Sequence, residues 1–151
     1  MKIITTNKRA YHDYEFEKEY DVGIVLKWYE VKSIKSSQVN IKDAIVRVSS
    51  GELRIHNMDI PLYARTSPLL VPSYEAKGKR KLLITKKELA KLSSKSDNAW
   101  YVIIPLEVFL SKSWLIKLKI WIGKRMRKVE KKQILKEKDI KREMDRDMKR
   151  I

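Results

Sequence analysis

The sequence predicts a mostly β, antiparallel fold with one or two short helices. Short runs rich in β-branched and aromatic residues recur along the chain, and in several of them apolar and polar residues alternate. Hydrophobic residues make up 43% of the 151 residues, which is enough for one buried core. Proline and glycine gather in one segment between these runs. We therefore expect short strands joined by turns and by one long loop.

The first strands are predicted between residues 14 and 28. The segments "YEFEKEY" and "VGIVLKW" have strand composition, and "YDVG" spans the point where they join. We expect a hairpin here, with its turn near "YDVG". The following segment, "EVKSIKSS", predicts a short helix that packs Val31 and Ile34 inward.

A second hairpin and a long loop are predicted next. The segment "NIKDAIVRVSSGELRIH" indicates two strands that meet at a turn around Ser50 and Gly51. The segment "IPLYARTSPLLVPSYEAKGK" contains three prolines and a glycine, so we expect no continuous helix or strand there. Connections longer than about 12 to 15 residues are uncommon unless they are functional or disordered.

The last part of the body predicts a helix and a third hairpin. Thr85 and Glu88 have the spacing of a capping box at the start of "TKKELAKL", whose two leucines fall on one face. The segments "WYVIIPLEVFL" and "WLIKLKIWI" are the strongest strand signals. In the second, residues 116, 118, 120 and 122 are apolar and alternate with Lys117, Lys119 and Trp121.

Six or seven short strands favour an OB-fold-like antiparallel β-barrel with short flanking helices. Closing the sheet removes the exposed edges that such apolar strands would otherwise present. The pattern changes near Gly123, so we expect a barrel over residues 1–123 and a basic C-terminal tail over residues 124–151.

The tail is predicted to be helical only when it is bound. It contains thirteen Lys or Arg and six acids, with neither glycine nor proline. Ile140, Met144, Met148 and Ile151 form an apolar stripe, but the stripe is narrow and buries little surface. We therefore expect a frayed segment in the free protein and a helix against a phosphate-lined partner.

The composition points to a polyanionic partner. The net charge is +16 and the pI is about 9.9, and nucleic acid is the leading candidate to neutralise this surplus. We expect no membrane partner, because the chain has neither an apolar run of about 18 residues nor the apolar core of a signal peptide. The predicted location is the cytoplasm.

Residues with the chemistry of catalysis or metal binding are scarce. The chain has no cysteine, and neither His12 nor His56 has a second ligand at metal spacing. No phosphate loop or dinucleotide motif is present. We expect no metal, no cofactor and no enzymatic activity.

Two groups near the N-terminus are candidates for RNA binding. Asn7, Lys8 and Arg9 have the charges and the amide that phosphate and sugar recognition uses, although a solvated N-terminal arm has the same composition. Asp21 is either a plain turn acid or an acid that accepts hydrogen bonds within a basic surface.

Two further groups lie later in the chain. The cations at positions 79–81 precede an apolar pair, which fits either a binding edge of the barrel or an edge strand guarded by charge. Lys117 and Lys119 share a strand face with Trp121, which indicates a basic groove with an aromatic platform or, more simply, a half-buried tryptophan between solvated lysines.

Four short motifs occur at distant points of the chain: Asn-Lys-Arg-Ala at 7–10, Glu-Val-Lys-Ser at 30–33, Asn-x-Lys-Asp at 40–43 and Arg-Lys-Leu-Leu at 80–83. Through them the chain resembles the small protein B family over nearly its whole length. These segments occur in the order and spacing expected of that family.

The resemblance implies a non-enzymatic adaptor, a monomer when free, that is built on an OB-type barrel. Such a protein binds the tRNA-like domain of transfer-messenger RNA and delivers it to ribosomes stalled on mRNA that lacks a stop codon. The implied RNA-binding residues are Asn7, Lys8, Arg9, Asp21, Lys32, Lys79, Arg80, Lys81, Leu83 and Lys117. The tail would enter the empty mRNA path near the decoding centre through Lys124, Arg125, Arg127, Lys128, Glu130, Lys131 and Lys132.

The chain departs from the family pattern at three places. Trp28-Tyr29 precedes Glu30 where the family usually has Gly-Thr, and Asp21-Val22-Gly23 stands where a Glu commonly precedes Ala-Gly. In the tail, Val129 occupies the usual aromatic position, so charge is retained while the ring is lost. Without the resemblance, the alternative is a ribosomal or generic single-stranded RNA-binding OB-fold protein, which would lose RNA affinity when the tail is cut. A basic nuclease is a more distant alternative.

Overall fold

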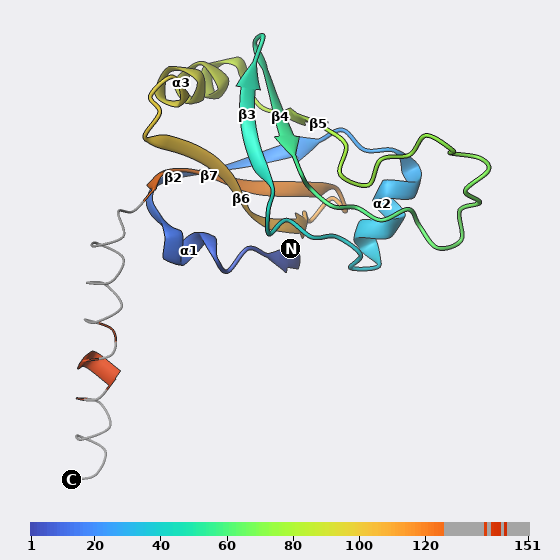
Figure 1. The fold of residues 1–151 in the computed structure, drawn as a ribbon, viewed down its shortest axis with the longest axis horizontal. Coiled ribbons are helices and arrows are strands. Elements are labelled where there is room, and N and C mark those ends of the chain that lie inside the picture. The colour runs from blue at the N-terminus through green and yellow to red at the C-terminus, as the bar shows by residue number, and fades with distance from the viewer. Residues whose placement is uncertain (126–137, 139, 143, 145–151) are drawn as a thin grey trace.

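The computed structural model describes residues 1–125, 138, 140–142 and 144. Seven strands and three helices follow one another along the first 125 residues (Figure 1). In chain order they are β1 Lys2–Thr6, α1 Ala10–Asp13, β2 Tyr14–Ile24, α2 Trp28–Lys35, β3 Ile45–Ser49, β4 Glu52–His56, β5 Arg80–Leu83, α3 Lys86–Ser96, β6 Tyr101–Leu110 and β7 Ile116–Arg125. Within this described part, no helix combines the length and the apolar character that crossing a membrane requires.

The strands pair antiparallel and close into a ring. The order is β3, β4, β5, β2, β7 and β6, and the pairing of β6 with β3 returns to the start through Val46 and Ile103. β1 adds to the edge of β6 through the register Lys2 to Leu110 and Thr6 to Glu107. The predicted mostly β, OB-like fold is confirmed, and it belongs to the barrel class because the pairings leave no open end between β3 and β6.

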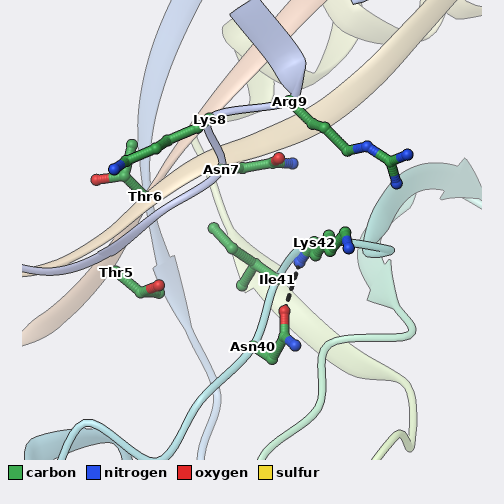
Figure 2. Close-up of a pocket in the computed structure, with 8 residues that line it drawn as sticks. All are labelled: Thr5, Thr6, Asn7, Lys8, Arg9, Asn40, Ile41 and Lys42. Atoms are coloured by element: carbon green, nitrogen blue, oxygen red, sulfur yellow. Dashed lines mark hydrogen bonds between the residues drawn. The ribbon is translucent and has the colours of Figure 1, made fainter.

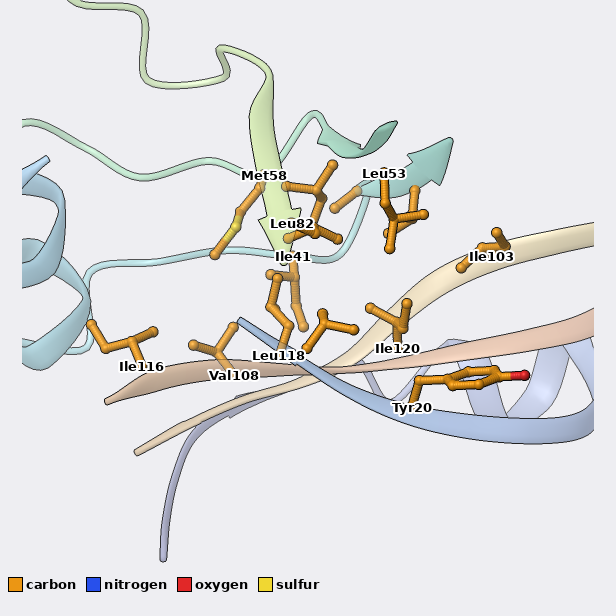
Figure 3. Close-up of a cluster of buried hydrophobic side chains, with 14 of the residues drawn as sticks. Tyr20, Ile41, Leu53, Met58, Leu82, Ile103, Val108, Ile116, Leu118 and Ile120 are labelled. Carbon is orange, nitrogen blue, oxygen red and sulfur yellow. The ribbon is translucent and has the colours of Figure 1, made fainter. Parts of the chain in front are cut away.

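The core fills the inside of this ring. Figure 3 shows side chains from several strands that converge on one another, among them Leu118 and Ile120 of β7. The alternation read from the sequence is confirmed, since the side chains at 116, 118, 120 and 122 are all buried. Ile34 of α2 and Leu92 of α3 each have no exposed surface, so both helices seal the core. They do so at opposite ends of the strands (Figure 1).

A small second cluster covers the outer side of β6 and β7. Trp121 is 3% exposed and packs with Ala10, Ile104 and Leu106. The rings of Tyr11 and of Phe16 also lie against it, with centroids 5.2 and 4.4 Å away. Trp121 is therefore a packing residue beneath α1, even more buried than the half-buried tryptophan expected, and it presents no aromatic platform to an RNA.

The hairpin predicted between residues 14 and 28 is wrong. β2 runs without a turn from Tyr14 to Ile24 and pairs with β7 from Tyr14 to Gly23. Asp21, which was placed at the turn, stands opposite Lys119 in this ladder. A long antiparallel partner satisfies the backbone of the "YDVG" segment, and this outweighs its local turn propensity. β1 and α1 were not predicted.

The other elements predicted before the tail are confirmed. β3 and β4 meet at Ser50 and Gly51, whose φ angles of 53° and 72° are those of a tight hairpin turn. Thr85 caps α3, because its hydroxyl accepts a hydrogen bond of 3.3 Å from the Glu88 amide. Residues 57–79 contain neither a helix nor a strand, as their prolines predict.

Replacing Gly123 with alanine should destabilise the barrel by about 1–3 kcal/mol, the usual cost of forcing a group into a packed site. A Cβ at this position would lie 2.5 Å from the Glu15 carbonyl oxygen, so β2 and β7 would have to separate. Urea unfolding measures the change. Lys124→Ala, at an exposed neighbour, is the control and should change the free energy of unfolding by less than about 0.5 kcal/mol. Equal stabilities of the two variants would contradict this account of the β2–β7 contact.

Candidate nucleic-acid interface

Two separate sequence segments meet around one pocket of about 310 Å³. One segment is residues 5–9, which form the corner between β1 and α1, and the other is residues 40–42, before β3. The Asn40 side chain accepts a 2.9 Å hydrogen bond from the Lys42 amide, which holds the second segment in a local turn (Figure 2). Lys8, Arg9 and Lys42 are exposed cations at this pocket. The sequence indicated the first two but did not single out Lys42 as a site residue.

Asn7 lies differently from its two neighbours. It is 7% exposed. Its backbone N–H donates to the Leu106 carbonyl at 2.6 Å, and its side-chain Nδ2 donates to the Pro105 carbonyl at 3.3 Å. Its side-chain oxygen is buried without a hydrogen-bond partner among the described residues. Asn7 therefore differs from Lys8 and Arg9, because its donors tie the corner to β6 while the two cations remain exposed. Its contact with RNA stays a prediction.

Arg80 lies furthest from the position expected of an RNA contact. It was predicted to bind RNA, but it is 6% exposed and all of its donor nitrogens bond within the protein. The guanidinium forms a salt bridge of 2.5 Å with Glu30 and donates to the carbonyls of Met58 at 2.7 Å, Ala76 at 2.9 Å and Gly78 at 3.1 Å. Arg80 thus fastens the 57–79 loop to α2. The sequence could not distinguish it from its exposed neighbours Lys79 and Lys81.

Three other predicted residues share one outer face of the barrel. Gly23 of β2 pairs with Leu83 of β5 on one side and with Lys117 of β7 on the other. Leu83 is 53% exposed and Asp21, two residues before Gly23, is also exposed. The ladder therefore brings an acid, an apolar side chain and a cation together, although 96 residues separate Asp21 from Lys117 in the chain.

A row of cations crosses the adjoining strands. Arg47 of β3 stands opposite Arg54 of β4, which in turn stands opposite Lys81 of β5, and all three are exposed. Neither arginine is among the site residues predicted from the sequence. Alternation in "IVRVSSGELRI" places both on the outer face, and the turn at Ser50 and Gly51 places them in register, so the hairpin pattern contained this signal.

His56, at the end of β4, reports on the charge in this region. Its pKa lies below the ordinary value of 6.5, first because of burial and then because of the positive charges of Lys79, Arg47 and Arg54. Both causes disfavour the protonated imidazole. The cations of β3, β4 and the segment before β5 therefore lie close enough to His56 to act on its charge.

Lys32 lies away from this row, on α2. It is exposed, and its ammonium lies 5.8 Å from the centre of the Tyr63 ring in the long loop. This contact places Lys32 at the end of the barrel where α2 and the loop meet, beside the loop that Arg80 fastens (Figure 1).

The predicted tail begins inside a strand. Lys124 pairs with Glu15 and Tyr101, and Arg125 pairs with Tyr14, so both belong to β7. Arg127, Lys128, Glu130, Lys131 and Lys132 lie outside the described residues. The described residues at 138, 140–142 and 144 have helical backbone and exposed side chains.

The site as described is built for binding an anion. It offers exposed cations on several strands, and among the residues that the structure describes no group of three or more His, Cys, Asp or Glu is placed to hold a metal ion. Lysine and arginine side chains arrayed on a sheet can neutralise phosphates.

Fold and surface together define a small basic RNA-binding protein on an OB-like barrel. The model of the family described as "SmpB protein" matches residues 4–150. The chain belongs to this family.

Relatives and a solved structure agree with this assignment. The SsrA-binding protein of Persephonella marina is 42% identical over 149 residues, which cover 99% of this chain and 95% of the relative. The SsrA-binding protein of Bacillus cereus is 39% identical over 145 residues, which cover 96% and 91%. A chain of the structure described as "tmRNA-SmpB: a journey to the center of the bacterial ribosome" is similar with a TM-score of 0.67 and 30% identity, over 87% of this chain and 93% of that one.

Proposed function

We propose that this protein is an RNA-binding adaptor that binds the tRNA-like domain of transfer-messenger RNA and delivers it to stalled ribosomes for trans-translation. The observation that carries the proposal is that the family segments at 7–10 and 40–43, far apart in the sequence, meet at one cationic pocket. The relatives named SsrA-binding protein and the similar structure described with tmRNA support the choice of RNA.

The proposed RNA contacts are the exposed members of the predicted set together with the half-buried Lys117. Cations supply the affinity, while Asp21 and Leu83 lie on the same outer face as Lys117 and supply hydrogen-bond acceptors and an apolar surface. The proposed contact residues are Lys8, Arg9, Asp21, Lys32, Lys79, Lys81, Leu83 and Lys117. Asn7 and Arg80 act indirectly, by holding the corner at residues 7–9 and the long loop.

The proposed role of the tail is to seat the adaptor on the ribosome. Residues 126–151 carry most of the tail's cations, including Arg127, Lys128, Lys131 and Lys132. A basic segment can follow a phosphate-lined path and fold upon it, because counterion release offsets the cost of ordering the chain. This function places the protein in the cytoplasm with the translating ribosome, and it involves no reaction catalysed by the protein itself.

The RNA that co-purifies with the protein from its native cell tests the proposal. We expect sequencing to show strong enrichment of a single species with a tRNA-like end. Its enrichment should fall in the double variant Lys8→Gln, Arg9→Gln, since the two cations lose their charge at the pocket while Asn7 keeps the corner in place. A broad mixture of RNAs, unchanged by the double substitution, would support instead a generic single-stranded RNA-binding protein.

A further inference from the structure

A second pocket, of about 440 Å³, lies where the end of β2, the start of α2 and the end of the long loop meet. Its lining includes the rings of Tyr29 and Tyr74 and the cations Lys27, Lys79 and Lys81. The volume is within the range of pockets that hold one small ligand or one group of a larger one. Neither tyrosine is among the proposed RNA-contact residues.

The aromatic walls of this pocket are held rigidly. The Tyr74 hydroxyl donates to the Ile60 carbonyl at 2.5 Å and accepts from Arg80 at 3.3 Å. The Tyr29 ring meets the Tyr74 ring edge to face, with centroids 5.2 Å apart, and it meets the Trp28 ring 5.5 Å away in the same manner. Side chains fixed in this way lose little freedom when a flat ligand stacks on them.

Charge at the rim favours an anion. Lys27, Lys79 and Lys81 are exposed, whereas the buried acid of the lining, Glu30, is neutralised by its salt bridge with Arg80. The remaining acid of the lining is Glu75, so the cations outnumber the free acids. Aromatic walls together with rim cations form the combination that binds unpaired nucleotides, by stacking on the base and by charge on the phosphate.

The cation row leads to this rim. Like charges placed directly opposite on neighbouring strands repel each other, and the row has two such pairs, Arg47 with Arg54 and Arg54 with Lys81. Glu52 offsets part of the repulsion, with its carboxylate 2.6 Å from Arg54 and 3.6 Å from Lys81. Successive phosphates of a nucleic-acid strand would remove the rest.

We propose that the pocket binds one unpaired nucleotide of an RNA, with its base against Tyr29 and Tyr74, and that Arg47, Arg54 and Lys81 hold the phosphates of the strand that leads to it. The identity of that RNA as transfer-messenger RNA rests on the proposed function. The pocket itself rests on the geometry of the rings and the cations.

Ultraviolet crosslinking of the full-length protein to transfer-messenger RNA, followed by mass spectrometry of tryptic peptides, tests the pocket directly. We expect nucleotide adducts on the peptide of residues 28–32, which contains Tyr29, and on the peptide of residues 66–77, which contains Tyr74. RNA that is retained and crosslinked only elsewhere would overturn the pocket and leave the proposed function standing. Failure to retain transfer-messenger RNA selectively would overturn the proposed function.

Variants at Tyr29 separate stacking from folding. Tyr29→Leu should weaken binding of that RNA about tenfold, within the range of one lost base–aromatic stack, and Tyr29→Phe should restore it. Trp100→Leu removes an exposed ring from the segment between α3 and β6 and should leave affinity unchanged. Figure 1 shows α3 at the opposite end of the barrel from α2. If Tyr29→Leu binds as tightly as Tyr29→Phe, the ring is not a stacking surface and the proposal fails.

The contribution of the cation row is measured by the salt dependence of RNA affinity. In the double variant Arg47→Gln, Arg54→Gln, the slope of log affinity against log salt should fall by about 0.7 for each single-strand phosphate contact that is lost. Lys86→Gln, at an exposed cation of α3, is the control and should leave the slope unchanged. An unchanged slope in the double variant would show that Arg47 and Arg54 are merely solvated and would remove the row from the proposal.

Discussion

Arg80→Met should lower the free energy of unfolding by about 3–5 kcal/mol, the cost typical of breaking a buried ion pair from one side. The substitution leaves the Glu30 carboxylate buried without its partner, and the carbonyls of Met58, Ala76 and Gly78 lose their donor. Equilibrium unfolding in urea measures the loss. Arg80 fastens the 57–79 loop to α2, so we expect the backbone amides of this loop to be the first whose hydrogen exchange becomes faster.

Three further variants separate this structural role from an RNA contact. Arg80→Lys keeps the positive charge but offers fewer donors in a different geometry, so it should still be clearly destabilised. The double variant Glu30→Met, Arg80→Met removes both charges and should be more stable than Arg80→Met alone. Lys81→Met, at the exposed neighbour, should cost less than about 1 kcal/mol. Arg80→Met with wild-type stability and weakened RNA binding would restore the original interpretation of Arg80 as a contact residue.

Truncation after Arg125 should abolish tagging of stalled peptides while binding of the tRNA-like RNA stays within about twofold of the full-length protein. The cut leaves β7 whole, so the barrel keeps Lys8, Arg9 and Lys117, whereas the ribosome loses the basic segment proposed to follow its mRNA path. Filter binding measures the RNA affinity, and translation of an mRNA without a stop codon measures the tagging. Equal loss of RNA binding and tagging would favour the generic RNA-binding alternative.

Point substitutions in the full-length chain refine the tail prediction. Charge reversal at Lys131 and Lys132 should abolish tagging, because it replaces attraction to phosphate with repulsion. Val129→Tyr restores the ring that the resembled family has and should leave tagging unchanged if electrostatic seating suffices. A gain in tagging from Val129→Tyr would show instead that the ring has a role which this chain performs less well.

Local patterns predicted those elements whose stability is itself local. The turn at Ser50 and Gly51 requires left-handed backbone that few residues adopt. Thr85 caps α3 through a residue only three positions later. Both features therefore depend on residues that are close together in the sequence. The inward set of β7 follows from strict alternation. β2 was misread because its length depends on β7, which lies about a hundred residues later in the sequence.

The candidate site, too, was predictable in part from local sequence and in part only from the structure. The residue types alone marked Lys8, Arg9 and the cations at 79–81 as candidates, since positive charge near the chain's motifs is visible without a fold. Burial then divided them, because Arg80 and Asn7 face inward and satisfy the backbone, while their neighbours face solvent. The neighbouring residues in the sequence do not show which of these side chains is buried. Burial depends on which carbonyls the folded loop brings within reach of each donor.

The sequence by itself thus determined that this protein is basic, mostly β and adapted to a polyanion, because charge, alternation and turn chemistry act over a few residues. Only the tertiary structure decided which cations are free to meet RNA, that Arg47, Arg54 and Lys81 stand in one row, and that Tyr29 and Tyr74 share a pocket. These are relations between segments far apart in the chain. They arise when strand pairing and core burial fix the segments side by side.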